Sequence, residues 1–118
     1  MSYDISIVDK NKETIMLDEP FLDKGGTYAV GGTTTAEFNI TFNYSKFLKN
    51  SLGYSIKELD GKKVEDTLDN ILNAILKLKD DDKTDNYWDP TEYNTKQALK
   101  SLLKLGLEAP NGYWEVLY

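Results

Sequence analysis

The clearest pattern in the chain is an alternation of apolar and polar side chains over residues 35–44. Successive side chains of an extended strand point to opposite faces, so this alternation predicts a β-strand with one face on the hydrophobic core. Its apolar positions are Ala36, Phe38, Ile40, Phe42 and Tyr44, and its polar positions are Glu37, Asn39, Thr41 and Asn43. Such a strand needs neighbouring strands and a covering layer, which restricts the fold more than any other feature of the sequence.

Shorter β-rich segments come before this strand. Residues 3–7 alternate in the same way, and residues 14–17 follow a polar turn, so the chain is expected to open with a hairpin. Residues 18–24 contain a proline and are expected to form a loop, with Phe21 and Leu22 holding it against the core.

After residue 44 the apolar period changes to that of helices. Ser45 is expected to cap a first helix that Gly53 ends. Amphipathic patterns predict a second helix over about 63–79 and a third from Pro90 or Thr91 to about 107. The residues expected to be buried in these two helices are Val64, Leu68, Ile71, Leu72, Ile75, Leu76, Ala98, Leu99, Leu102, Leu103 and Leu107.

The order of these elements predicts the fold class. Residues 113–118 are too apolar to lie in water, so they are expected to pack as a last strand or in an interface. Strands first and helices later are typical of α+β proteins, in which helices cover one face of an antiparallel sheet. We expect one α+β domain over residues 1–118, with a small antiparallel sheet of three to five strands packed against two or three helices.

The composition argues against several classes of function. Histidine, cysteine and arginine are absent, which removes most of the usual catalytic, metal-binding and phosphate-clamping side chains. The net charge of −6 without a basic stripe argues against direct nucleic-acid binding. No apolar run reaches membrane-spanning length and the N-terminus lacks a secretory signal, so a cytoplasmic protein without membrane contact is expected. We expect no catalytic residue, no metal and no cofactor.

The first candidate site is a glycine-rich segment. Glycine pairs at 25–26 and 31–32 bracket residues 27–30, which are expected to form a short strand. Backbone N–H groups in such turns can bind an anion together with threonine hydroxyls, although the spacing is not that of a P-loop. The alternative is a pair of tight turns that only connect strands. The candidate ligand-binding residues here are Thr27, Tyr28, Thr33 and Thr34.

The second candidate site is the polar face of the strand over residues 35–44. Asparagine is unfavourable in strands because its side chain competes for backbone hydrogen bonds. Asn39 and Asn43 flank Thr41 on this face, and together they form a row of donors and acceptors for a ligand or another protomer. The alternative is that the asparagines are satisfied inside the protein or by water.

The third candidate site is the segment before the last long helix, where Tyr87 and Trp88 are adjacent. A helix N-terminus has free N–H groups that attract anions, and aromatic side chains beside it can stack on a planar group. Thr91 and Asn94 are expected to point toward the same place. In the alternative, the aromatic pair closes the end of the core and Thr91 only caps the helix. The acidic run at 80–82 lacks the spacing of an EF-hand and is expected to be a solvated loop.

These stretches resemble a group of small proteins, without an assigned activity, that phages and prophages encode. The resemblance extends from the first strand to Trp114. The motifs that carry it are residues 25–33 (GGTYAVGGT), residues 39–44 (NITFNY) and residues 87–91 (YWDPT), with Asn94 and Ala98–Leu99. It implies a phage context and supplies no mechanism and no catalytic residue.

Small acidic phage proteins without enzyme motifs often act on the host, and one class blocks bacterial immunity. The resemblance thus implies an accessory binding protein in the bacterial cytoplasm. We expect a host-defence antagonist that sequesters a small nucleotide-derived ligand in one pocket formed by the three candidate sites. The aromatic tail at 113–118 adds the expectation of a homo-oligomer. The alternatives are a protein-binding inhibitor of a host defence protein, using the acidic run at 80–82 and a helix surface, and a small nucleotide-acting enzyme.

Overall fold

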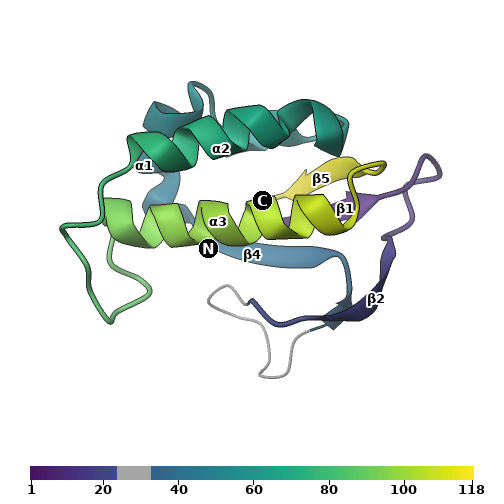
Figure 1. Cartoon of the computed structure of the whole chain (residues 1–118), viewed down its shortest axis with the longest axis horizontal. Helices are drawn as coiled ribbons and strands as arrows, with labels where there is room; N and C mark the ends of the chain where they lie inside the picture. Colours follow the sequence, from purple (N-terminus) through teal and green to yellow (C-terminus); the bar gives the residue numbers. More distant parts are fainter. Residues whose placement is uncertain (24–32) are drawn as a thin grey trace.

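Strands and helices lie in separate layers in the computed structural model, which describes residues 1–23 and 33–118 (Figure 1). The elements in chain order are β1 (Ser2–Val8), β2 (Met16–Phe21), β3 (Thr33–Thr35), β4 (Glu37–Thr41), α1 (Ser45–Leu52), α2 (Leu68–Lys77), α3 (Glu92–Glu108) and β5 (Tyr113–Leu117). One antiparallel sheet has the strand order β4-β1-β5, and β2 pairs with β3 in a second sheet. The α+β prediction is confirmed.

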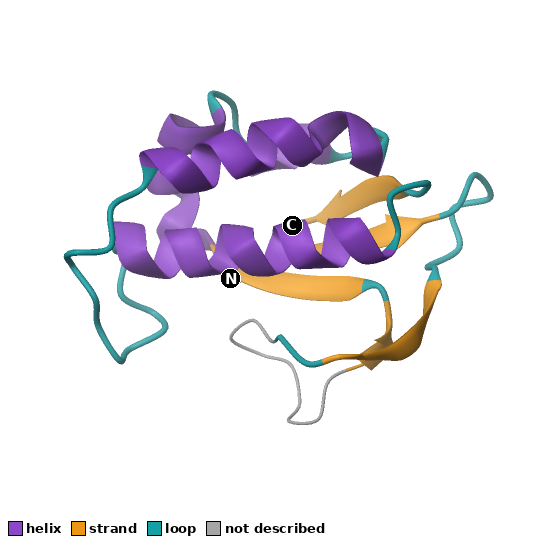
Figure 2. Cartoon of the chain, viewed as in Figure 1, coloured by secondary structure: helices purple, strands orange, loops and turns teal. Residues whose placement is uncertain are grey.

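β1 is the central strand of the larger sheet and pairs with both of its neighbours. Ile5 lies opposite Phe38 of β4 and opposite Val116 of β5. The helices cover one face of this sheet (Figure 2), and alternate side chains on that face enter the core. The buried sheet residues on this face are Tyr3, Ile5, Ile7, Phe38, Ile40, Trp114 and Val116.

Residues 113–118 pack within the chain as β5 and the residue that follows it. Trp114 is buried, and its indole N–H donates to the Thr67 hydroxyl at 2.8 Å. The prediction of a last strand is confirmed. Because Trp114 and Val116 are covered by this protein's own core, the tail gives little reason to expect a second copy, and the homo-oligomer stays a prediction.

The outer edge of β5 is closed by the turn that precedes α2. The Gly61 N–H donates to the Trp114 carbonyl at 2.8 Å, and the Trp114 N–H donates to the Lys62 carbonyl at 2.9 Å. The Asp60 carboxylate accepts the Val116 N–H at 2.9 Å. These contacts occupy backbone groups that would otherwise be open to another strand.

The outer edge of β4 is closed by a side chain. The Tyr87 hydroxyl accepts the Thr41 N–H at 3.2 Å and lies 3.5 Å from the Asn39 carbonyl, to which it can donate. One hydroxyl thus contacts both a donor and an acceptor of the free edge, as the backbone of an added strand would do.

The helix boundaries agree with most of the expected signals. Gly53 ends α1 with a φ of +89°, where a residue with a Cβ would be strained. Thr91 caps α3, and its hydroxyl accepts the Asn94 N–H at 3.1 Å. Ser45 is not the N-cap of α1 but its first residue, and its hydroxyl donates to the Phe42 carbonyl at 2.6 Å.

The long strand expected over residues 35–44 is interrupted at both ends. A bend at Ala36 separates β3 from β4, and β4 ends at Thr41. Residues 42–44 form a 3₁₀ turn because the Thr41 hydroxyl accepts the Asn43 N–H at 3.2 Å. Apolar residues in this turn still enter the core, since Tyr44 is fully buried, so the alternation continues past the end of the strand.

The prediction of a loop over residues 18–24 is wrong for the first part of this segment. Residues up to Phe21 belong to β2, including Pro20, which a two-stranded sheet tolerates because each strand has a free edge. Phe21 is buried as expected, whereas Leu22 is exposed. The strand expected over residues 27–30 lies outside the described residues.

Three helical leucines expected in the core are exposed. They are Leu72 and Leu76 of α2 and Leu107 of α3, whereas Ala74, Leu105 and Gly106 are buried. The apolar stripe on each helix is wider than the arc that the sheet and the neighbouring helix cover.

No helix in the described part of the chain is long and apolar enough to cross a membrane.

Gly112→Ala is expected to lower the free energy of unfolding by about 2 to 3 kcal/mol, because overpacking forces the surrounding core to move. An added Cβ would collide with Ile7 and would lie 2.7 Å from Ile15 Cδ1 and 3.0 Å from the Val8 carbonyl oxygen. Urea denaturation measures the loss. Gly53→Ala is the control, since its Cβ would meet no atom within 4 Å and it should lose about 1 kcal/mol through its positive φ. Equal losses for the two variants would contradict the packing argument.

Candidate functional site

The segment at the end of β4 and the loop before α3 meet, and this contact brings two of the candidate sites together. The Asn43 amide donates to the Trp88 carbonyl at 2.8 Å. The Tyr44 hydroxyl donates to the Tyr87 carbonyl, and the Tyr87 hydroxyl closes the edge of β4 at Thr41. Candidate residues from two distant parts of the sequence therefore form one cluster.

Tyr44 anchors this cluster from inside the core. Its burial, and after that the neighbouring Tyr87 and Asp89, raise the pKa of the Tyr44 hydroxyl well above its usual value. The hydroxyl therefore stays protonated and remains a hydrogen-bond donor. The Tyr87 ring packs against the Tyr44 ring at 5.5 Å between centroids and against Trp88 edge-on at 4.8 Å.

Asn94 and Thr91 hold the loop in place rather than facing an open site. The Asn94 amide donates to the Asn86 carbonyl at 2.9 Å and to the Asp89 carbonyl at 3.0 Å. Asn94 is buried, and the Thr91 hydroxyl accepts its backbone N–H. These two residues therefore match the structural alternative, in which their polar groups serve the fold.

The polar row on β4 is largely covered. Asn39 and Thr41 are each only 1% exposed. The Asn39 amide donates to the Ser2 hydroxyl and to the Asp4 carboxylate, both at 2.7 Å. Its carbonyl oxygen is buried without a hydrogen-bond partner in the described part of the chain. Of the row, only Asn43 faces solvent.

Among the candidate residues that the structure describes, Trp88 has the largest accessible aromatic surface, at 45% exposed. Thr33 and Thr34 of the glycine-rich candidate lie in β3 of the two-stranded sheet, where the Thr33 hydroxyl donates to the Thr35 carbonyl at 2.9 Å and Thr34 is exposed. Thr27 and Tyr28 lie outside the described residues. The expected convergence of all three candidate sites into one pocket therefore stays a prediction.

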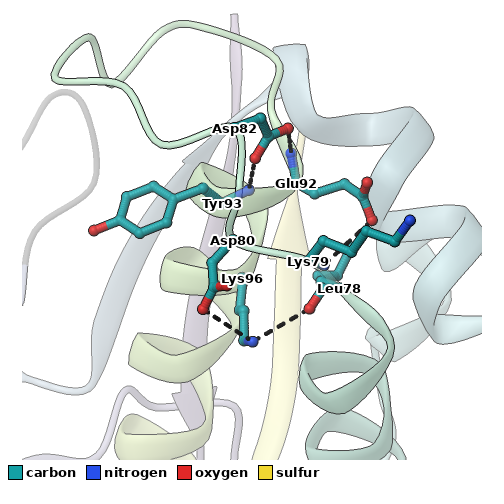
Figure 3. Close-up of polar contacts among 7 residues, drawn as sticks. All are labelled: Leu78, Lys79, Asp80, Asp82, Glu92, Tyr93 and Lys96. Atoms are coloured by element: carbon teal, nitrogen blue, oxygen red, sulfur yellow. Dashed lines mark hydrogen bonds and ion pairs between the residues drawn. The ribbon is translucent and has the colours of Figure 1, made fainter.

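The N-terminus of α3, expected to attract an anion, already holds one from the protein itself (Figure 3). The Asp82 carboxylate accepts the N–H groups of Glu92 and Tyr93, each at 2.9 Å. Loss of hydration acts to raise the pKa of Asp82, but these hydrogen bonds outweigh it and hold the pKa below its usual value. A phosphate at this helix end would have to displace Asp82.

A lysine fixes the start of the same loop. The Lys96 ammonium donates to the Leu78 carbonyl at 3.2 Å and pairs with Asp80 at 3.6 Å, as Figure 3 shows. The acidic run at 80–82 is thus tied to α3 at both of its ends. Reversing its charges would disturb this loop as well as any partner that binds there.

An exposed apolar surface on the helical layer was missed by the sequence analysis, which assigned its residues to the core. Leu72, Leu76 and Leu107 are 43%, 72% and 61% exposed, and Leu103 is half-buried. Each helix contributes a pair spaced four residues apart, which places the pair on one side of that helix. We call these four residues the leucine seam.

The two leucine pairs lie on neighbouring helices, because α2 and α3 pack side by side. A Cβ at Gly106 would lie 2.9 Å from Leu68 Cδ2, so the start of α2 contacts the end of α3. The Lys96 contact with Leu78 joins the opposite ends. Leu72 follows Leu68 by one turn of α2, and Leu103 precedes Gly106 by about one turn of α3, so both lie next to the contact between the two helices.

A cavity of about 520 Å³ lies away from all of these residues, between the turn after β1 and the outer part of β5. The charged groups that line it are of both signs, and they are Asp9, Lys10, Lys12, Asp60 and Glu115. Asp9 and Asp60 already accept backbone N–H groups. Within the described residues, no cluster of acidic side chains is arranged to hold a metal ion.

Asn94→Ala is expected to lower the free energy of unfolding by about 1 to 3 kcal/mol, because it leaves loop carbonyls without their donor. Asn43→Ala is the matched control, since it removes one amide hydrogen bond from an exposed position and should cost less than about 1 kcal/mol. Chemical denaturation followed by circular dichroism measures both. A larger loss for Asn43→Ala would show that the loop is not held through Asn94.

Asp82→Ala is expected to lose stability in a pH-dependent way. The pKa of Asp82 is below its ordinary 3.8 in the folded protein, so its contribution is complete above about pH 4 and disappears as pH falls through the lowered pKa. The difference in Tm between wild type and variant should therefore shrink on acidification. Asp81→Ala removes a carboxylate from the same run but keeps these hydrogen bonds. An Asp82→Ala difference that persists in strong acid would contradict the charge-assisted cap.

Comparisons with known proteins do not identify a relative with a similar site. No protein-family model matches the chain, and neither a curated protein nor a solved structure matches it. The resemblance to small phage and prophage proteins therefore stays a prediction from the motifs quoted above. Its consequences for function are proposals.

Proposed function

We propose that this protein is a non-catalytic binding protein that docks another protein on its leucine seam. The observation that carries the proposal is the exposure of Leu72, Leu76 and Leu107 beside half-buried Leu103 on the two packed helices α2 and α3. Surfaces of this kind often mark interaction sites when they are continuous and bordered by polar residues. Burying one leucine completely is worth about 1.5 to 3 kcal/mol, so several together can anchor a partner.

The absence of histidine, cysteine and arginine supports a function in binding rather than in chemistry. The phage context implied by the motif resemblance makes a bacterial defence protein the first class of partner to test. The protein would then act as an inhibitor by occupying a surface that its partner needs. This mechanism uses the helix surface that was one of the expected alternatives, without requiring the acidic loop.

A second candidate function is the binding of a small planar ligand, such as a nucleotide base, on Trp88. The accessible indole supports it, because its edge-on contact with Tyr87 leaves ring surface open to stacking. Asn43 is exposed beside it and carries an amide that could contact a polar edge. The Asp82 cap at the helix N-terminus weighs against a phosphate subsite there.

Photo-crosslinking tests the protein-binding function. With p-benzoylphenylalanine at Leu76 or at Leu107, bacterial cells should yield the same crosslinked partner from both positions. Leu117 is the control position, since it is exposed on β5 away from the helices. Leu72→Glu should remove the crosslink formed from Leu76. Crosslinks that form equally from Leu117, or none from the seam, would exclude this function.

Fluorescence titration with nucleotides tests the second candidate. Quenching should come from Trp88, because Trp114 is buried, and Trp88→Phe identifies the source of the signal. Trp88→Ala should abolish binding with little change in the free energy of unfolding. Quenching that survives in Trp88→Phe would place the ligand elsewhere.

A further inference from the structure

We infer that the cavity of about 520 Å³ beside β5 binds a short zwitterionic peptide, with the peptide's carboxylate at the turn after β1 and its ammonium group at Glu115. The lining of this cavity shares no residue with the leucine seam. The site therefore goes beyond the proposed function, and its tests are independent of the crosslinking result.

The cavity includes the face of β5 that points away from the helices, which cover the other face (Figure 2). Trp114 and Val116 enter the core. The side chains that alternate with them point to the opposite face, and they are those of Tyr113, Glu115 and Leu117. All three residues line the cavity. Its volume is within the range of about 300 to 1,000 Å³ typical of sites for small ligands.

Two lysines form the positive end of the cavity. Lys10 and Lys12 belong to the turn after β1, and both are exposed and line the cavity. Within the described part of the chain, neither ammonium group forms a hydrogen bond or an ion pair. The Asp9 carboxylate accepts the backbone N–H groups of Asn11 and Glu13, at 2.8 and 3.1 Å, and holds the turn. Both ammonium groups are therefore available to a carboxylate of a ligand.

Lys12 has a backbone conformation that suits glycine better. Its φ is +63°, in the left-handed region where a residue with a side chain is strained. Glycine would form the same turn without this strain, so the turn itself does not require a lysine. The strain offers a way to separate a role of this side chain in binding from a role in folding.

The other end of the cavity is acidic. Glu115 forms no ion pair within the described residues. A second hollow, of about 420 Å³, shares Glu115 and Leu117 with the cavity, and its other charged lining residues are Asp4 and Glu37. The sheet register places Glu37 and Glu115 on either side of Ser6. An ammonium group is stabilised at this end, whereas an anion is repelled.

The distance between the two ends sets the length of the ligand. Tyr113 pairs with Val8 next to the turn, and Glu115 and Leu117 follow at two and four residues along β5. The acidic end is therefore about 7 to 13 Å from the turn. An extended tripeptide spans about 10 Å and reaches both ends. Its middle side chain then lies over the apolar part of the lining, which Val8, Tyr113 and Leu117 supply.

A ligand with both charges fits this protein better than a simple anion. The net charge of −6 repels anions at long range, whereas a zwitterion has no net charge. Two carboxylates of the cavity, those of Asp9 and Asp60, already accept backbone N–H groups. Glu115 is thus the carboxylate of this cavity left for an ammonium group, and the two lysines are left for a carboxylate.

Titration of the ¹⁵N-labelled protein with trileucine tests the inference. The peptide should shift the amide signals of Lys10, Lys12, Tyr113 and Glu115 at millimolar concentration. N-acetyltrileucine lacks the ammonium group and trileucinamide lacks the carboxylate. Each should bind about twofold to fivefold more weakly, as expected for the loss of one exposed ion pair. Triglycine keeps both charges and should also bind more weakly, because it lacks the apolar side chains.

Two variants match the two blocked peptides. Lys12→Gly should weaken trileucine about twofold to fivefold and leave the affinity for trileucinamide unchanged. Glu115→Gln should weaken trileucine by about the same factor and leave N-acetyltrileucine unchanged. Because Lys12→Gly relieves the positive φ, its Tm should not fall, so lost binding would not come from unfolding. Lys100→Ala, which removes an exposed lysine of α3 outside the cavity, should change no affinity.

Three outcomes would overturn the inference. The first is the absence of shifts around the cavity with millimolar trileucine. The second is an equal loss of affinity in Lys12→Gly and Lys100→Ala, which would show only the effect of net charge. The third is binding of N-acetyltrileucine as tight as that of trileucine, which would indicate an anion site without an acidic end.

Discussion

A sheet only three strands wide has to satisfy the backbone groups on both of its edges, and the rest of this protein depends on how it does so. At β5 the turn containing Gly61 and Lys62 supplies backbone partners. At β4 a single hydroxyl, that of Tyr87, contacts the backbone N–H of Thr41 and the carbonyl of Asn39. Both solutions come from segments that also position helices, so the sheet and the helical layer stabilise each other.

This dependence explains why the polar residues before α3 look like a binding site in the sequence. Loop carbonyls need donors and the helix N-terminus needs acceptors, and Asn94, Asn43 and Asp82 supply them. Residues of the types used for ligand recognition are thus engaged in holding the loop. The Trp88 indole remains accessible. The leucines of the helical layer that do not face the core are accessible too.

Much of the fold could be predicted because local patterns and tertiary structure agree over β1, α1, α3 and β5. The alternation over residues 35–44 did not reveal where the strand ends. Thr41 turns the backbone, but Tyr44 still enters the core and continues the apolar pattern. Leu72 and Leu76 could not be assigned correctly because an apolar stripe does not reveal how much of its width a neighbour covers. The contact of Asn43 with Trp88 could not be predicted from local sequence patterns, because it depends on how the helical layer packs onto the sheet.

The pairing of β1 has a consequence for the order of folding. Its two partners are β4, which follows after a long connection, and β5, which lies at the far end of the described chain. During synthesis the central strand therefore stays without one of its two partners, and its apolar face stays incomplete, until β5 has been made. A nascent chain of this kind offers unpaired strand edges to chaperones and to other nascent chains, and its yield in the cell depends on how quickly the last strand arrives.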